Sequence, residues 1–127
     1  MERKTKITGT GIPNIGLPFS PAILSGDFVF VSGQASVDLD GNIVSASFDE
    51  ECRRSFENIR AVLKAAGLDF DDVVQVRAYV ANQADLPAFN AIYKEYFSEP
   101  YPARSTLIGC LGDMLKFEVD VTARTSV

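Results

Sequence analysis

The chain has 127 residues, a formal net charge of −5, two cysteines and no histidine. Without histidine it cannot form a Ser-His-Asp triad, a Cys-His pair or a zinc site with a histidine ligand, and two cysteines cannot complete an all-cysteine zinc site. The acidic balance weighs against nucleic acid as a partner, because phosphate binding needs a basic surface. A length of 127 residues is typical of a single domain, which we expect over residues 1–127. Because the usual zinc ligand sets are missing, we expect no bound metal.

Nothing in the sequence predicts contact with a membrane. No apolar run approaches the roughly 18 residues of a spanning helix, and residues 1–10 are polar, unlike the apolar stretch of a signal peptide. Two cysteines in such a chain are typical of a reducing compartment. We expect a cytoplasmic protein.

Residues 22–34 predict a β-hairpin. Two short apolar runs, 22–24 and 28–31, flank a glycine-containing turn. The second run continues into Ser32 and Gly33, where glycine permits a bulge or a close approach of the backbone. This strand end either presents a backbone donor and a hydroxyl to a ligand or is an ordinary strand exit.

The clearest predicted helix lies between Ser47 and Gly67. Ser47 and Glu50 match a capping box at its start, and Gly67 provides the stop. Spacings of 4, 3, 4 and 3 place five residues on one apolar face: Cys52, Phe56, Ile59, Leu63 and Ala66. We interpret Cys52 as a core residue.

A strand follows over residues 73–80, with Val74, Val76, Ala78 and Val80 predicted on one side. A second helix is expected to begin at an Asp85 cap and to end before Pro100-Tyr101-Pro102. Its predicted buried stripe contains Phe89, Tyr93 and either Tyr96 or Phe97.

Two more strands complete the pattern, over residues 103–108 and 116–125, with a loop over 109–115 between them. The last strand alternates regularly between apolar residues and polar ones such as Glu118. Two helices would cover one face of the sheet. The other, polar face would meet either water or another subunit.

Arg104 is the first candidate for chemistry. Period-2 alternation places it with Thr106 and Ile108 on one side of its strand. If that side is the polar side of the last strand, Arg104 and Glu118 share a face. The arginine could then clamp a carboxylate through two parallel hydrogen bonds while the glutamate moves protons, or the two could form an ordinary salt bridge.

Cys110 directly follows this strand in the loop. It is either a redox-sensitive thiol near a cleft or an ordinary loop thiol.

Over about residues 18–123 the chain resembles the reactive intermediate deaminase (Rid, or YjgF) family. Four segments carry the resemblance, in the order and at the spacing of the family: FVFVSGQ at 28–34, NIRAVLKAAG at 58–67, FNAIYKEYF at 89–97 and PARS at 102–105. The resemblance implies a chorismate-mutase-like α+β fold, with a six-stranded mixed sheet and two helices on one face. It also implies a homotrimer with sites between subunits. The implied reaction is cofactor-independent hydrolysis of carboxylate-bearing imines and enamines, such as 2-iminobutanoate and 2-iminopropanoate.

The resemblance also implies roles for individual residues. Arg104 matches the family arginine that grips the substrate carboxylate, and Glu118 matches the glutamate that positions the attacking water. The remaining matches line the site: Ser32 and Gly33 at a strand end, Asn90 on the second helix, and Thr106, whose backbone carbonyl would face the substrate nitrogen.

Two departures from the family pattern affect the expected site. Phe19 stands where many family deaminases have tyrosine, so a hydroxyl is missing, and the loop over 110–115 is one residue short. They motivate an alternative, in which the same trimer binds a small metabolite or regulates without turnover. A third hypothesis, ribonuclease action, is disfavoured by the negative charge and the absence of histidine.

Overall fold

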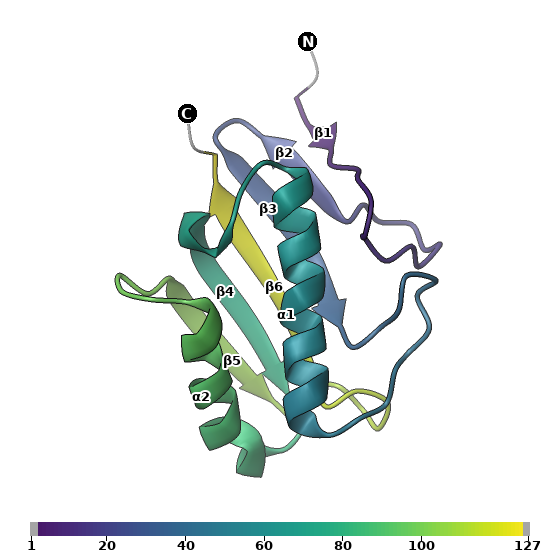
Figure 1. The fold of residues 1–127 in the computed structure, drawn as a ribbon, viewed down its shortest axis with the longest axis vertical. Coiled ribbons are helices and arrows are strands. Elements are labelled where there is room, and N and C mark those ends of the chain that lie inside the picture. Colours follow the sequence, from purple (N-terminus) through teal and green to yellow (C-terminus); the bar gives the residue numbers. More distant parts are fainter. Residues whose placement is uncertain (1–2, 126–127) are drawn as a thin grey trace.

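In the computed structural model, described for residues 3–125, one six-stranded sheet carries two α-helices on a single face (Figure 1). The strands lie in the order β1-β2-β3-β6-β4-β5, and only β4 and β5 are parallel. The elements are β1 (Thr5–Lys6), β2 (Ala22–Ser25), β3 (Phe28–Ala35), α1 (Phe48–Ala65), the 3₁₀ turn η1 (Phe70–Asp72), β4 (Val73–Val80), the 3₁₀ turn η2 (Gln83–Asp85), α2 (Leu86–Tyr96), β5 (Ala103–Ile108) and β6 (Phe117–Arg124). The expected α+β architecture with a mixed sheet is confirmed.

The predicted hairpin and bulge are both present. Strands β2 and β3 pair antiparallel from Ser25 and Phe28 onward, and Gly26 occupies the turn with a φ of 61°. The pairing of β3 with β6 shifts register between Val31 and Gln34. The extra residue of a bulge therefore falls at Ser32 and Gly33, where the sequence predicts it.

Helix α1 begins and ends as expected, with one difference at its cap. The Ser47 Oγ accepts a hydrogen bond from the Glu50 backbone N–H at 3.2 Å. The Glu50 carboxylate bonds to the Ser47 hydroxyl at 3.3 Å, whereas a capping box would direct it to the backbone. Gly67, with a φ of 76°, ends the helix. Cys52 is fully buried, as predicted, and burial raises the pKa of its thiol.

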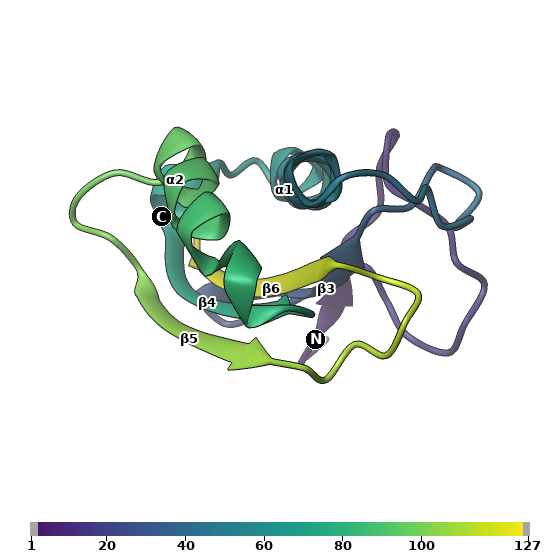
Figure 2. The same cartoon turned by 90° about the horizontal axis from the view of Figure 1, so that it is seen from below.

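The core lies between the sheet and the two helices (Figure 2), and aromatic rings form its centre. The Phe56 ring stacks on Tyr96 at 4.7 Å between centroids and packs against Phe117 at 5.5 Å. Phe89 from α2 contacts Phe117 at 5.2 Å. Such ring pairs add about 0.5–1.5 kcal/mol each beyond area burial, and here they join both helices to β6. None of the helices within residues 3–125 is long and apolar enough to span a membrane.

Two predictions about local structure are wrong. Val74 is 42% exposed and does not share the buried side of Val76, because the pairing of β4 with β6 shifts register between Val73 and Gln75. Val73 takes the buried position. Asp85 precedes α2 without a side-chain capping bond. The preceding turn, η2, takes the cap instead, with the Asn82 side chain accepting from the Ala84 N–H.

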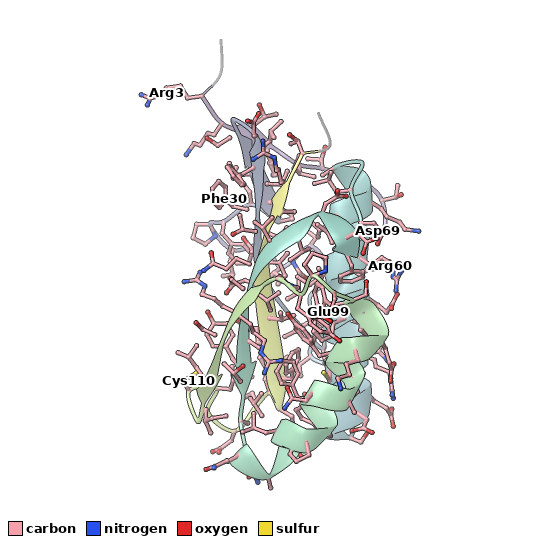
Figure 3. The ribbon with its side chains drawn as sticks, turned by 90° about the vertical axis from the view of Figure 1, so that its left-hand side faces the viewer. Arg3, Phe30, Arg60, Asp69, Glu99 and Cys110 are labelled. Carbon is pink, nitrogen blue, oxygen red and sulfur yellow. The ribbon has the colours of Figure 1, made fainter. Side chains whose placement is uncertain are left out.

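The sheet face opposite the helices is uncovered in the single chain. It carries polar side chains from β6 and β4, but it also exposes apolar ones. Phe30 is 49% exposed and Leu107 43% exposed, and Figure 3 shows Phe30 pointing away from the helix layer. This face is therefore less polar than the alternation of β6 alone predicts.

Candidate functional site

Arg104 and Glu118 lie on opposite faces of the sheet of one chain, so the condition under which they would share a face is not met. In the parallel β4–β5 ladder Arg104 stands opposite Val76, which is fully buried beneath the helices. Glu118 stands opposite Tyr79 on the other face. The residues proposed for the site from sequence therefore fall into two groups around two separate hollows.

The first hollow, which we call the glutamate hollow, is lined by Phe19, Ser32, Gly33 and Glu118. The rest of its lining is mostly apolar: Ile15, Leu17, Ala35, Val37, Gly41, Ile43 and Leu115. Its volume is about 470 Å³. Four of the residues singled out in the sequence meet here, although they lie up to about a hundred positions apart along the chain.

The Glu118 carboxylate lies directly against the backbone of Gly33. A Cβ atom at position 33 would stand 2.7 Å from the Glu118 Oε2, closer than side chains pack. Glycine at this bulge is therefore what allows the carboxylate its place. Burial, and secondarily the negative charge of Asp120, raises the pKa of Glu118 above its ordinary value.

Asp120 lies two residues beyond Glu118 on the same face and is held by two donors. The Arg77 Nε donates to Asp120 Oδ1 at 3.0 Å, and the Tyr79 hydroxyl donates to Asp120 Oδ2 at 2.9 Å. Burial and this hydrogen bond to a carboxylate raise the pKa of Tyr79. The network fixes a charged neighbour beside Glu118.

Ser32 fixes the segment that carries Phe19. Its hydroxyl donates to the Ser20 carbonyl at 2.6 Å, and its backbone N–H donates to the Pro21 carbonyl at 2.9 Å. Phe19 itself is 48% exposed. Ser32 thus shapes the hollow as well as lining it.

A buried glutamate joins the two loops that flank the glutamate hollow. The Glu51 side chain, 1% exposed, accepts hydrogen bonds from the Ala46 N–H at 3.1 Å and the Lys116 N–H at 3.0 Å. The Lys116 ammonium pairs with the same carboxylate at 3.2 Å and donates to the Ala46 carbonyl at 2.6 Å. Donors on two sides compensate the burial of this charge and fix the chain just before Glu118.

The second hollow, which we call the arginine hollow, is lined by Asn90, Tyr93, Lys94, Tyr101, Pro102 and Arg104, and its volume is also about 470 Å³. The Arg104 guanidinium lies over the rings of Phe89 and Tyr93, with its Cζ 4.9 and 4.8 Å from their centroids. These cation–π contacts restrain the guanidinium and leave its N–H groups available for an anion.

Thr106 lies two residues beyond Arg104 on the same side of β5, opposite Ala78. It lies outside the lining of the arginine hollow. Its buried hydroxyl has no hydrogen-bond partner within residues 3–125. Cys110 is exposed beyond the end of β5 (Figure 3) and lines neither hollow.

In the part of the chain that the structure describes, no three acidic or cysteine side chains come together as metal ligands. The two hollows instead supply a fixed cation, a carboxylate and hydrogen-bonding groups. Those groups suit the binding of a small carboxylate and the transfer of protons to or from water.

Sequence reasoning missed several walls of both hollows. Tyr93 and Lys94 stand three and four positions after Asn90, on the same edge of α2, so helical spacing could have identified them. The loop residues 37–43 carried no comparable signal. Their place beside Glu118 depends on tertiary contacts such as those of the Asn58 side-chain amide, which donates to the Ala35 and Val37 carbonyls at 3.0 and 3.2 Å.

Comparison with known proteins gives a consistent result. The sequence profile described as "Endoribonuclease L-PSP" matches residues 12–125. A RutC family protein of Saccharolobus solfataricus is 40% identical over 111 residues, which cover 86% of this chain and 88% of that protein. The human 2-iminobutanoate/2-iminopropanoate deaminase is 34% identical over 108 residues, covering 84% of this chain and 79% of the relative.

Solved structures show the same fold. The crystal structure of E. coli TdcF with bound serine superimposes with a TM-score of 0.85 at 30% sequence identity, over 96% of this chain and 99% of that chain. The six-stranded sheet with two helices is thus shared across nearly the full length of both chains.

Proposed function

We propose that this chain, which belongs to the endoribonuclease L-PSP family, also called the Rid or YjgF family, hydrolyses reactive 2-imino and 2-enamino acids to 2-oxo acids and ammonia. The observation that carries the proposal is Arg104, stacked on two rings and without an ion pair in the described chain. An arginine placed in this way is suited to a small carboxylate. A relative named 2-iminobutanoate/2-iminopropanoate deaminase supports the choice of substrate.

The chemistry requires few groups. An enamine first tautomerises to the imine, whose carbon is electrophilic, most of all when its nitrogen is protonated. Arg104 holds the substrate carboxylate, and Glu118 accepts a proton from water as the water oxygen bonds to the imine carbon. Glu118 then returns this proton to the carbinolamine nitrogen, the C–N bond breaks and the hydroxyl proton passes to water, so that ammonia leaves and the 2-oxo acid remains. Asn90, Ser32, Gly33 and Thr106 orient the substrate and the water.

Two copies of the chain are needed to bring these groups together. Because Arg104 and Glu118 lie on opposite faces of one sheet, a single substrate reaches both only where the arginine hollow of one copy meets the glutamate hollow of another. We propose a homotrimer, in which each of three such meetings forms one site. The uncovered sheet face supports this arrangement, because it exposes Phe30 and Leu107.

The proposal also places the protein in the cytoplasm. Both cysteines are free, Cys52 in the core and Cys110 on the surface, as expected in a reducing compartment. Whether Cys110 is redox-sensitive stays a prediction.

A binding function is the second candidate. Phe19 offers no hydroxyl at the wall of the glutamate hollow and is half-exposed there, so the same site could hold a small carboxylate without turning it over. A carboxylate that raises the melting temperature while no imine is hydrolysed faster would favour this function.

The name of the matching profile raises ribonuclease activity as a third candidate. The net charge of −5 weighs against it, because a ribonuclease needs cations for the phosphates. RNA cleavage that survives further purification and disappears in Glu118→Ala would revive it.

The direct test couples the purified protein to an amino-acid dehydratase or oxidase that releases imines, and follows formation of the 2-oxo acid. We expect faster formation with the wild type and no acceleration with Glu118→Gln, which keeps the shape of the side chain but cannot accept the proton. Equal rates with and without the wild-type protein, across imines from several amino acids, would contradict the proposal.

A further inference from the structure

The arginine hollow holds a second cation that the proposed reaction does not use. Lys94 lines the hollow together with Arg104, and neither has an ion pair within residues 3–125. Glu95, the acidic residue next to Lys94 in the sequence, already forms an ion pair with Arg53. Its two oxygens accept from Arg53 at 3.0 and 2.7 Å. The charge of Lys94 is therefore not neutralised by its neighbour.

The two cations come from different elements, and both residues are exposed at the hollow. Arg104 extends from β5, and its guanidinium lies over the rings of Phe89 and Tyr93. Lys94 is exposed and stands one helical turn after Asn90 on α2, along the edge that borders the hollow. One cation is thus held against two aromatic rings, whereas the other extends from the edge of the helix beside it.

The polar groups between the cations are neutral donors. The Tyr93 phenol is neutral at pH 7, as an ordinary tyrosine is, and burial raises its pKa further, to about 12. The Tyr93 hydroxyl is buried and has no hydrogen-bond partner within residues 3–125. A hollow with two unpaired cations is a local exception in a chain with a net charge of −5. This arrangement favours a ligand with two negative groups over a ligand with one.

We infer that the arginine hollow selects imino acids with a second carboxylate, the C1 carboxylate on Arg104 and the side-chain carboxylate on Lys94. This inference rests on the proposed function for the reaction, but the preference for a dicarboxylate is a property of binding and can be measured without turnover. Lys94 is then a specificity-determining residue.

Succinate and butyrate are matched probes, because both contain four carbons and differ in the second carboxylate. We expect calorimetry on the full chain to show succinate binding about tenfold more tightly than butyrate, as an added charge-assisted contact would give. Lys94→Met should bring the two affinities together, while Lys64→Met, the same charge change at an exposed position on α1, should leave the preference intact. Equal affinities in the wild type, or a preference that survives Lys94→Met, would overturn the inference.

Turnover separates this inference from the proposed function. The imines released by an oxidase from aspartate and from 2-aminobutyrate form the corresponding substrate pair, and we expect kcat/KM to favour the dicarboxylate by about tenfold in the wild type and not in Lys94→Met. Turnover of both imines with equal kcat/KM would contradict the inference alone. A succinate preference without turnover of either imine would contradict the proposed function and support the binding preference.

Discussion

The two hollows are built in different ways. The arginine hollow comes from one short stretch, residues 90–104, in which α2 and β5 follow each other along the chain. The glutamate hollow is assembled from residues between 15 and 118 and depends on a bulge, a glycine contact and the buried Glu51. The cation site is thus drawn from a short stretch of the chain that packs on the common core, whereas the site for the base joins segments far apart in the sequence.

Among the residues that bind or position groups, the largest effect should come from Arg104 in the arginine hollow. Arg104→Ala removes the group that grips the carboxylate, and we expect kcat/KM for imine hydrolysis to fall about 100-fold. Arg104→Lys should recover only part of the loss, because an ammonium cannot form two parallel hydrogen bonds. Coupled assays of 2-oxo acid formation measure both, and an Arg104→Ala variant as active as the wild type would show that the arginine does not bind substrate.

The glutamate hollow should be sensitive to a single methyl group. Gly33→Ala places a Cβ 2.7 Å from the present position of the Glu118 Oε2, so the carboxylate must move. We expect kcat to fall about tenfold while the melting temperature changes little, because a flexible side chain can yield where backbone could not. Unchanged kcat in a folded Gly33→Ala protein would mean that the position of Glu118 against the bulge is irrelevant to the reaction.

The difference between local and long-range structure also decides what the sequence could predict. The hairpin, the bulge at Ser32 and Gly33, and helix α1 depend on local patterns, and all three are found where the sequence predicts them. The relation of Arg104 to Glu118 depends on which strands become neighbours. Strand β6 inserts between β3 and β4, and β5 pairs parallel to β4 at the edge.

The other differences have similar causes. Alternation predicts a buried Val74, but a register shift with β6 exposes it. Aspartate is a residue type that often caps helices, but Asp85 lies within the turn η2. The capping bond there is made by Asn82, at the start of that turn. In both cases a neighbouring segment changes the local geometry, and a pattern read along one segment does not contain that information.

The pH dependence of activity should distinguish the base from the clamp. Asp120→Asn removes a negative charge beside Glu118 and frees Arg77, so the pKa of Glu118 should fall. Because a base must be deprotonated to act, the acidic limb of the kcat profile should move to lower pH. Asp71→Asn, an equal charge change on the surface at η1, should leave the profile in place.

The same change has a consequence for stability. In the wild type the raised pKa of Glu118 contributes stability below its ordinary pKa, and this contribution is lost as the pH rises through the raised value. Asp120→Asn should weaken that pH dependence in urea unfolding.

The activity profile gives the contrary outcome. If the acidic limb of the kcat profile of Asp120→Asn does not move, or moves to higher pH, Glu118 is excluded as the titrating group.

The smallest effect should come from Phe19. Phe19→Tyr adds a hydroxyl at a half-exposed wall of the glutamate hollow, so we expect folding to be unaffected and kcat/KM to rise by a factor of about three through one added hydrogen bond. A loss of activity would indicate that an apolar wall is required for the substrate of this chain. Melting curves with and without a carboxylate provide the control.

The central claim is that one site is formed by the arginine hollow of one copy and the glutamate hollow of another. Co-expression of differently tagged Arg104→Ala and Glu118→Ala chains, followed by purification of the mixed oligomers, tests it directly. Each parent should retain only a small residual activity. The mixed trimers should regain about a third of wild-type activity, because one of the three sites in a mixed trimer has both contributing halves intact. Mixed oligomers no more active than either parent would contradict the shared site.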